Sequence, residues 1–257
     1  MGVDYVLFDK LVELSTRWQP SKGGRTLMLG RHTFKIQTQF AKDYEASLKR
    51  NGIEGRRFDY LQDDAYCETL MEKLGFGPME AMDFSGFEGA TILHDLNKPP
   101  APELENQFDF IFDGGTIEHV FNVPQALETV YSMLKPGGRF VSANGMNGWP
   151  GHGMYQFNPE LVWTFWSRAC NCVVHDCRAM PKIPGGKVGE QPFRDPAATG
   201  RRLRMKGKIG TGRTYLYYEI EKTEDSHPPT YALQSDYEVK WQGSDMAGTT
   251  RFEKEDA

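Results

Sequence analysis

The sequence predicts an α/β fold built on a doubly wound, mostly parallel sheet. Short apolar runs typical of buried strands alternate with longer segments of helical pattern, and several runs end directly at glycine or aspartate. Strands that alternate with helices in this way pair in parallel, because each helix carries the chain back across the sheet. The chain has 257 residues, enough for one large domain of this kind.

The first part of the chain is expected to contain three helices and three short strands. The helices are predicted at Leu7–Arg17, Phe34–Arg50 and Asp63–Leu74, and the strands at Thr26–Leu29, Met79–Met82 and Thr91–Leu93. Gly52 and Gly75 follow the second and third helices, since glycine adopts the left-handed conformation that commonly ends a helix.

The second part of the chain adds four strands and two helices. The strands are predicted at Phe108–Phe112, Arg139–Ala143, Cys172–Met180 and Thr214–Lys222, and the helices at Thr116–Leu134 and Leu161–Arg168. Asn158 and Pro159 precede the last helix, where they suit the N-cap and the first helical position.

The pattern divides the chain into three parts. Residues 1–24 are predicted to form an N-terminal helical extension, 25–222 the main domain, and 223–257 a polar tail. The main domain includes an insert at 182–213, between its last two strands. This insert is rich in glycine, proline and basic residues, and we interpret it as either a solvated loop or a clamp for an anionic ligand.

Composition excludes several classes of protein. The formal net charge of −5 argues against a general nucleic-acid binder, and no apolar run reaches the roughly 18 residues of a membrane span. The N-terminus lacks the cationic start of a secretory signal, so a cytoplasmic protein is expected. The C-terminal tail is compatible with folding back over the site or with pairing in a homodimer.

The four cysteines do not form a recognisable framework. Cys170, Cys172 and Cys177 are clustered, with His175 among them, whereas Cys67 is remote. The spacing C-x-C-x4-C is not that of a paired zinc set, and the segment is expected to be a strand. We therefore expect buried thiols and no metal site.

Four predicted strand ends carry residues suited to a nucleoside ligand, which in open α/β sheets lies beyond the carboxyl ends of the strands. An acid can bind the ribose hydroxyls, polar and backbone groups can meet the base, and glycines let a ligand approach the backbone. The candidates in chain order are Gly30, Asp83 with Ser85, Asp95 with Leu96, and Asp113-Gly114-Gly115. The carboxylates at 83 and 95 also suit ordinary turns and caps.

Two of these segments resemble one family. FDFIFDGGTIEHV at Phe108–Val120 resembles the fourth-strand segment of class I S-adenosylmethionine-dependent methyltransferases, and LKPGGRF at Leu134–Phe140 resembles their fifth-strand segment. The resemblance covers roughly residues 25–145. It implies a Rossmann-like doubly wound sheet of seven strands, mostly parallel with an antiparallel last strand, and S-adenosylmethionine as the cofactor.

The first loop departs from the family pattern of three glycines at alternate positions. Gly30 matches the first glycine, but His32 and Phe34 replace the other two, and Arg31 and His32 would contact the donor along another path. The ribose acid also lies far along the chain. Asp83 is preferred over Asp59, because Asp59 would leave one strand too many, and residues 52–74 are then an inserted helical segment.

Methyl transfer to oxygen or nitrogen requires alignment of the nucleophile and removal of its proton. His119, beside Glu118 at the start of a helix, and His152, in the loop after the fifth strand, are the candidate bases. Tyr155 and Gln156 in that loop would contact the acceptor. The simpler interpretations are that His119 caps its helix and that His152 packs in a turn.

The sequence suggests three candidate functions. The first is an enzyme that methylates a small-molecule acceptor, such as a sugar or secondary metabolite. If the basic insert is a clamp, this acceptor carries a negative charge. The second is a catalytically degenerate methyltransferase-fold binding or scaffold protein, suggested by His32 and Phe34. The third, a nicotinamide-dependent oxidoreductase, is disfavoured because no G-x-G-x-x-G follows any strand.

Overall fold

The computed structural model describes residues 2–185, 188–198, 202–205, 207–235 and 237, so the predicted tail beyond Tyr237 and part of the basic insert lie outside the described residues. The helices are α1 (Tyr5–Arg17), α2 (Ala41–Arg50), α3 (Glu68–Lys73), α4 (Val123–Met133) and α5 (Pro159–Leu161), which continues as a π-helix over Val162–Ala169. The strands are β1 (Gly2–Val3), β2 (Thr26–Leu29), β3 (Thr33–Phe34), β4 (Met79–Asp83), β5 (Ile92–Leu93), β6 (Phe108–Asp113), β7 (Leu134–Asn147), β8 (Val173–Pro181), β9 (Gln191–Pro192) and β10 (Thr214–Glu221).

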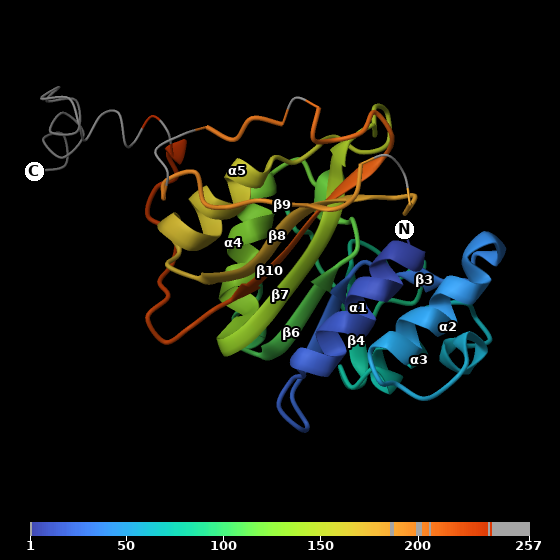
Figure 1. The fold of residues 1–257 in the computed structure, drawn as a ribbon. Coiled ribbons are helices and arrows are strands. Elements are labelled where there is room, and N and C mark those ends of the chain that lie inside the picture. The colour runs from blue at the N-terminus through green and yellow to red at the C-terminus, as the bar shows by residue number, and fades with distance from the viewer. Residues whose placement is uncertain (1, 186–187, 199–201, 206, 236, 238–257) are drawn as a thin grey trace, which may run out of the picture.

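The main sheet has the strand order β5-β4-β2-β6-β7-β10-β8-β9 (Figure 1). Strands β5, β4, β2, β6 and β7 are parallel, and β10 lies antiparallel between β7 and β8, which confirms the predicted topology. The prediction of seven strands was wrong by one. The additional strand is the short edge strand β9, which pairs with β8 at only two positions. The strand order reverses between β2 and β6, where ligands of open α/β sheets bind.

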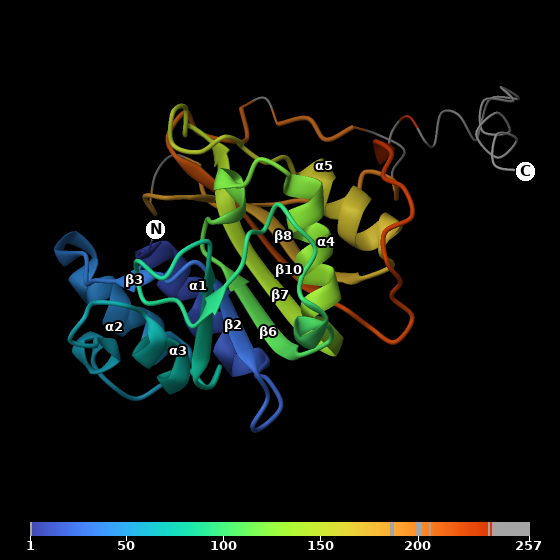
Figure 2. The same cartoon turned by 180° about the vertical axis from the view of Figure 1, so that it is seen from behind.

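Helices cover both faces of the sheet, as the two opposite views show (Figures 1 and 2). Met28 of β2 points into a core shared with α1, whereas its neighbours Leu27 and Leu29 point into a second core shared with α4. The same alternation places Phe110 and Ile111 of β6 on opposite faces. Burial on both faces is why these strands read as continuous apolar runs in the sequence.

The helix predicted at Phe34–Arg50 begins later, at Ala41. Thr33 and Phe34 form β3, which pairs in parallel with β1, and the Phe34 N–H donates to the carbonyl of Ala65 at 2.9 Å. The Phe34 side chain is fully buried in the core beside α1. A tertiary contact with a distant segment therefore determines the conformation of this stretch, against its helical periodicity.

Two other predicted helices are also shorter than expected. The segment predicted at Asp63–Leu74 is helical only over α3, because Asp64 accepts from the Tyr66 N–H in a turn and Ala65 has a φ of 63°. The segment Thr116–Leu134 begins with a 3-10 turn at Ile117–His119, and α4 starts only at Val123. Strand β7 is longer than predicted and includes the LKPGG segment at its start.

The aromatic helix after β7 begins as expected. The Asn158 side chain accepts from the Glu160 N–H at 3.0 Å, and Pro159 is the first helical residue. Among the described residues, no helix is long and apolar enough to cross a membrane. All four cysteines are free thiols in buried positions.

Candidate active site

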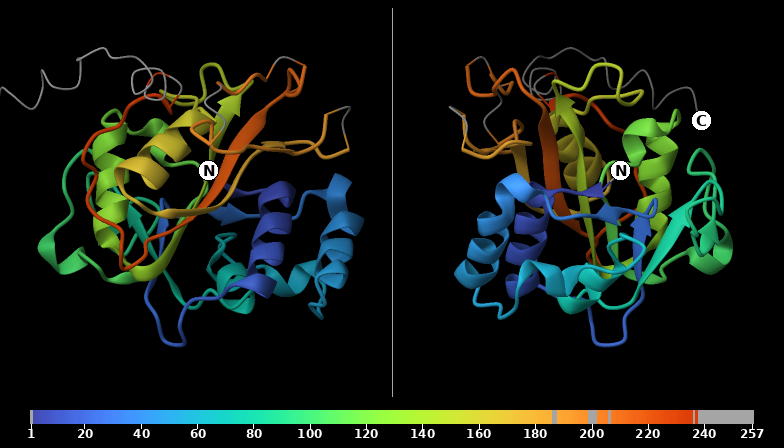
Figure 3. Two further views of the ribbon diagram at one scale, coloured as in Figure 1. Left: turned by 60° about the vertical axis from the view of Figure 1, so that its left-hand side comes forward. Right: turned by 90° about the vertical axis from the view of Figure 1, so that its right-hand side faces the viewer.

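The carboxyl ends of the parallel strands meet at one edge of the sheet, where their arrowheads point in the right-hand view of Figure 3. Gly30, directly after β2, has a φ of 72°, and a Cβ there would lie 2.7 Å from Oγ1 of Thr116 and 3.9 Å from Oδ2 of Asp83. The Thr116 hydroxyl donates to the Leu29 carbonyl. Glycine is required at this position, because three strand ends come together around it.

Asp83 ends β4 and is half-buried beside Gly30. Its carboxylate has no hydrogen bond or ion pair with any residue that the structure describes, so both oxygens are available to a ligand. Ser85 lies in the exposed turn that follows, where its hydroxyl accepts from the Phe87 N–H at 3.4 Å. These two predicted residues therefore lie at the edge of the sheet where the parallel strands end.

Asp95 is engaged within its own turn. It accepts from the backbone and side-chain amides of Asn97, at 3.0 and 2.8 Å, and lies 3.3 Å from the Lys98 ammonium. These contacts hold the pKa of its carboxyl below the usual value. Leu96, the next predicted residue, is buried in the core shared with α4.

His32 packs against the loop that follows β6. Its Nε2 accepts from the Gly114 N–H at 3.1 Å, and the ring lies edge-on to Phe112 with centroids 5.3 Å apart. A Cβ on Gly114 would lie 3.2 Å from the imidazole. The histidine thus joins the divergent first loop to Gly114-Gly115.

Asp113 is fully buried and holds this loop from inside. Its carboxylate accepts from the N–H groups of Gly115 and Thr116 and from the side chains of Ser142 and Asn144. Burial raises the pKa of the carboxyl, and these four donors act in the opposite direction. The N–H groups of the two buried glycines are thus both used inside the protein, that of Gly114 by His32 and that of Gly115 by Asp113.

Phe34 lies away from the strand ends. It stacks on Phe8 of α1 with ring centroids 5.6 Å apart and contacts Tyr44 of α2 at 6.1 Å. A phenylalanine that filled the donor site would favour the scaffold interpretation. The observed position of Phe34 removes that argument, and His32 is the residue that occupies the divergent loop.

Glu118, His119 and His152 form a cluster beside this edge. Oε1 of Glu118 lies 3.3 Å from Nε2 of His152 and 3.8 Å from Nε2 of His119, and the two imidazole rings pack edge-to-face. Glu118 is buried, with 2% of its side chain exposed, whereas both histidines reach solvent. Residues from the turn after β6 and the loop after β7 therefore converge on one point.

The protein backbone fixes the position of Glu118. Its N–H donates to Asn144 at 3.1 Å, and its second carboxylate oxygen accepts from the Gly145 N–H. Its carbonyl accepts from the N–H groups of Met154 and Tyr155, at 2.9 and 3.2 Å. The loop after β7 is thereby tied to the turn after β6.

The electrostatics of the cluster favour exchange of a proton. Burial raises the pKa of Glu118 to about 7, the Gly145 N–H opposes this effect, and the charge of Asp113 adds to it. Burial also lowers the pKa of His119 and of His152. Carboxyl and imidazole groups thus titrate closer together than their ordinary values, as acid–base catalysis requires.

Beyond the cluster, the side chains of Arg213 and Lys182 lie over the ring of Trp149, a residue that was not among the candidates from the sequence. The Trp149 ring is 4.8 Å from the His152 ring, and it is flanked by the Arg213 guanidinium at 4.7 Å and the Lys182 ammonium at 5.0 Å. Lys182 also lies 3.7 Å from Asp4. The glycine-rich, aromatic composition of the loop was the only signal for Trp149.

The cluster also has the side chains that bind divalent cations, since one atom from each of its members lies within 4.8 Å of the others. It contains one carboxylate, however, and the charges of Lys182 and Arg213 lower the pKa of His152. Nearby positive charge opposes a bound cation. This environment fits proton transfer or an anion better.

The two predicted acceptor residues are used within the loop itself. The Tyr155 hydroxyl donates to the Phe121 carbonyl at 2.8 Å, and its ring stacks on Phe157. The Gln156 side chain accepts from the Trp149 N–H at 3.0 Å. Tyr155 is nevertheless partly exposed, so one part of its ring is accessible.

Large apolar side chains are exposed in the segments that follow the strand ends. Phe84 and Phe87 follow β4, Phe121 follows the turn after β6, and Met154 lies in the loop after β7. Their exposed fractions range from 62% to 93%. Exposed apolar groups of this size mark binding surfaces more often than other parts of a surface.

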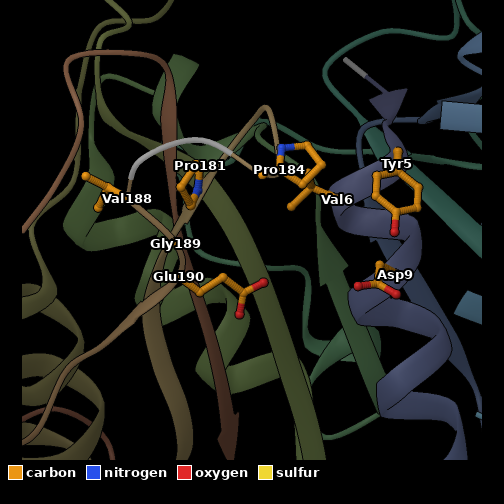
Figure 4. A pocket seen from close by; sticks show the side chains of 9 residues that line it. Tyr5, Val6, Asp9, Pro181, Pro184, Val188, Gly189 and Glu190 are labelled. Atoms are coloured by element: carbon orange, nitrogen blue, oxygen red, sulfur yellow. The ribbon is translucent and has the colours of Figure 1, made fainter. Parts of the chain in front are cut away.

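A separate small cavity of about 130 Å³ lies between α1 and the segment after β8. Figure 4 shows Tyr5, Val6 and Asp9 of α1 on one side and Val188 and Glu190 on the other. None of the predicted site residues lines it. The candidate site is therefore the open edge of the sheet.

Comparison with known proteins supports this location. The profile of the family described as "Methyltransferase domain" matches residues 82–142, from the end of β4 into β7. The matched range includes Asp83, Asp113 and the Glu118-His119 pair. No curated protein matches the chain in sequence.

Solved structures resemble the chain at low similarity. The 1,6-didemethyltoxoflavin-N1-methyltransferase of Burkholderia thailandensis, with bound S-adenosylhomocysteine, is 14% identical with a TM-score of 0.40, over 86% of this chain and 80% of that one. A complex of the Haloferax volcanii Trm112 methyltransferase activator with a methyltransferase is 16% identical with a TM-score of 0.44, over 87% of this chain and 96% of that one. Values this low carry no argument about reaction or ligand.

The family match confirms the resemblance predicted from the sequence. The matched segment is that of a methyltransferase domain, in a chain with the expected α/β fold, and the methyl donor of this class of enzyme is S-adenosylmethionine.

Proposed function

We propose that the protein transfers a methyl group from S-adenosylmethionine to an oxygen or nitrogen atom of a small-molecule acceptor, such as a sugar or a secondary metabolite. The observation that carries this proposal is the convergence of Glu118, His119 and His152 beside the donor edge of the sheet. A structural cap would not bring three titratable groups from two loops to one point.

The donor is framed by the strand ends. The Asp83 carboxylate, which has no partner among the described residues, is suited to accept from the two ribose hydroxyls. In this proposal the donor lies against the backbone at Gly30 and Gly114-Gly115, where Thr116 and the His32 ring leave no space for a Cβ at Gly30 and Gly114, and its base lies beside Leu96 and the Asp95 turn. These assignments follow the strand order and the accessibility of each group.

Methyl transfer here is a single in-line displacement. The acceptor atom forms a bond with the methyl carbon as the carbon–sulfur bond breaks, and S-adenosylhomocysteine leaves as the neutral thioether. The acceptor proton passes to the imidazole of His152, whose Nε2 faces Glu118 at 3.3 Å, and the carboxylate stabilises the imidazolium that forms. His119 is the second candidate base, because its Nε2 faces the same carboxylate.

An acceptor with an anionic group fits the charges around the cluster. Arg213 and Lys182 lie over the Trp149 ring, which packs on His152, and no carboxylate of the described residues pairs with Arg213. A phosphate or carboxylate on the acceptor would supply that partner. Pairing of two copies of the chain stays a prediction.

The competing function is a methyltransferase-fold scaffold without catalysis, and the position of the His32 ring against Gly114 is its remaining support. Calorimetric titration with S-adenosylmethionine and S-adenosylhomocysteine separates the two functions. We expect saturable binding of both. Lack of binding to either at millimolar concentration would overturn the enzyme proposal.

A catalytic role is tested separately from binding. Substitution of His152 by Asn removes the base and leaves a side chain of similar reach, so donor binding should persist while formation of S-adenosylhomocysteine with a panel of hydroxyl and amine acceptors falls by about 100-fold or more. Equal rates for this variant and the wild type would exclude His152 as the base.

A further inference from the structure

Arg31 occupies the position directly after Gly30 and has four partners. Its Nε donates to Glu68 at 2.5 Å, Nη2 to Asp64 at 2.7 Å and Nη1 to the carbonyl of Glu88 at 3.1 Å. The guanidinium also lies over the ring of Tyr66, 3.9 Å from its centroid. Its planar array of donors is thus used in three directions at once.

Three of these partners, Asp64, Tyr66 and Glu68, belong to the inserted segment, which has many internal hydrogen bonds. The Gln62 amide donates to Asp64 and to Glu68, at 2.6 and 2.8 Å, and its oxygen accepts from the Thr69 N–H at 2.8 Å. Ala65 has a φ of 63°, a conformation that costs energy for a residue with a Cβ. The surrounding contacts hold this turn in one form.

The same segment is fastened to the divergent loop. Thr33 forms an isolated antiparallel bridge with Tyr66, and the Phe34 N–H donates to Ala65. Residues 62–68 thus support the stretch where the family has its second and third glycines. A loop without these glycines needs such external support, since its backbone is not shaped by its own sequence.

The fourth partner links Arg31 to the donor side. Glu88 lies in the turn that follows Asp83, and a Cβ on Gly89 would lie 3.2 Å from Nη1 of Arg31. This turn also contains Phe84 and Ser85, at the edge where the donor is expected. The guanidinium therefore connects this turn to the inserted segment.

We propose that Arg31 is a positioning residue for donor binding, and that the inserted segment 62–68 acts through it in place of the missing glycine loop. Arg31 joins Asp64 and Glu68 to the Glu88 carbonyl and thereby holds the turn 84–89 in the form that receives S-adenosylmethionine. This inference rests on the proposed function, because it requires that the donor binds beside Asp83.

The test measures S-adenosylhomocysteine binding by calorimetry, which needs no acceptor. Arg31→Met is expected to weaken binding by about tenfold or more, since it removes three charge-assisted hydrogen bonds. Arg31→Lys keeps the charge but loses the planar array, so partial recovery is expected. In this proposal Glu68 does not contact S-adenosylhomocysteine and acts only through Arg31. Glu68→Gln removes its charge and should therefore weaken binding by severalfold.

Arg25 provides a matched control at the opposite end of the same strands. It pairs bidentately with Glu80 at 2.8 and 3.0 Å and likewise joins β2 to β4. Arg25→Met should lower the melting temperature but leave the dissociation constant within about twofold. Circular dichroism of each variant reports whether it is folded.

The outcomes separate this inference from the proposed function. Failure of the wild-type protein to bind either nucleoside defeats the proposed function. Wild-type binding with unchanged affinity in Arg31→Lys and Glu68→Gln defeats the positioning role, whether or not Arg31→Met folds. Weakening by Arg31→Met with no effect of Glu68→Gln would mean that Arg31 contacts the donor directly, and that result also overturns the inference.

Discussion

Oε1 of Glu118 lies 3.3 Å from Nε2 of His152, although the two residues belong to different loops. The carboxylate is buried, whereas the imidazole reaches solvent. A buried carboxylate can both orient a neighbouring imidazole and stabilise its protonated form. The pair therefore has the arrangement of a base with its supporting acid, and the predictions begin with the titration of Glu118.

Glu118→Gln should stabilise the protein at high pH. The pKa of Glu118 is about 7 in the folded protein, against about 4.3 in an unfolded chain, so the folded state binds more protons between these values. The stability that protonation gives is present at low pH and is lost as the pH rises through 7. Relative to wild type, the variant should gain about 3 kcal/mol between pH 4 and pH 8, measured by urea unfolding.

Asp95→Asn is the control, because its effect on stability should change with pH in the opposite direction to that of Glu118→Gln. Hydrogen bonds from Asn97 hold the pKa of Asp95 below its usual value, so its stabilising effect is present at neutral pH and lost as the pH falls. This variant should be less stable than wild type at pH 8, and the difference should fade in acid. Identical pH trends for the two variants would contradict the assigned shifts.

Gly30→Ala should be destabilising through both backbone and packing. The φ of 72° is unfavourable for alanine, and the added Cβ would meet the Thr116 hydroxyl at 2.7 Å. We expect a loss of about 2–3 kcal/mol in the free energy of unfolding. Gly137→Ala, with a φ of 81° and open space around the Cβ, should lose only about 1 kcal/mol. Equal losses would show that the contact with Thr116 is unimportant.

The sheet was predictable because its strands are buried on both faces. The apolar runs at β2 and β6 determine their own conformation and position, and the order of helices and strands then leaves few topologies. Helix boundaries were less predictable. Phe34 continues a helical pattern, but pairing with β1 and the hydrogen bond that its N–H donates to the Ala65 carbonyl decide its conformation.

The site was partly predictable for a related reason. Strand ends meet at one edge, so the candidates Gly30 and Asp83 could be placed from their positions along the chain. The convergence of Glu118 with His152 depends on the path of a loop that periodicity does not describe. The contacts of Arg31 with residues 62–68 join segments whose pairing leaves no pattern in the sequence.

Chelation should leave methyl transfer unchanged. Glu118, His119 and His152 carry at most one negative charge between them, because the pKa of Glu118 is about 7. The positive charges of Lys182 and Arg213, beside the adjoining Trp149, also oppose a bound cation. Turnover after dialysis against EDTA should therefore match the untreated protein within about twofold. Loss of activity that returns with Mn²⁺ or Mg²⁺ would reassign the cluster as a metal centre.

Phe34 should matter for folding and not for the donor. It is fully buried between Phe8 and Tyr44, so Phe34→Ala should cost about 3–5 kcal/mol of stability. Phe34→Leu preserves most of the apolar contact and should remain folded. S-adenosylhomocysteine should bind this variant within about twofold of wild type, as measured by calorimetry.

His32 is the residue at which the scaffold hypothesis is decided. Because its ring lies against Gly114, a donor that needs this space would bind more tightly to His32→Gly than to wild type. If the loop is instead part of the donor site, loss of the bond from the Gly114 N–H loosens it, and we expect binding about tenfold weaker. Isothermal titration of S-adenosylhomocysteine into His32→Gly and Phe34→Leu distinguishes these cases. Binding restored only in His32→Gly would identify the wild-type protein as a scaffold with a blocked donor site.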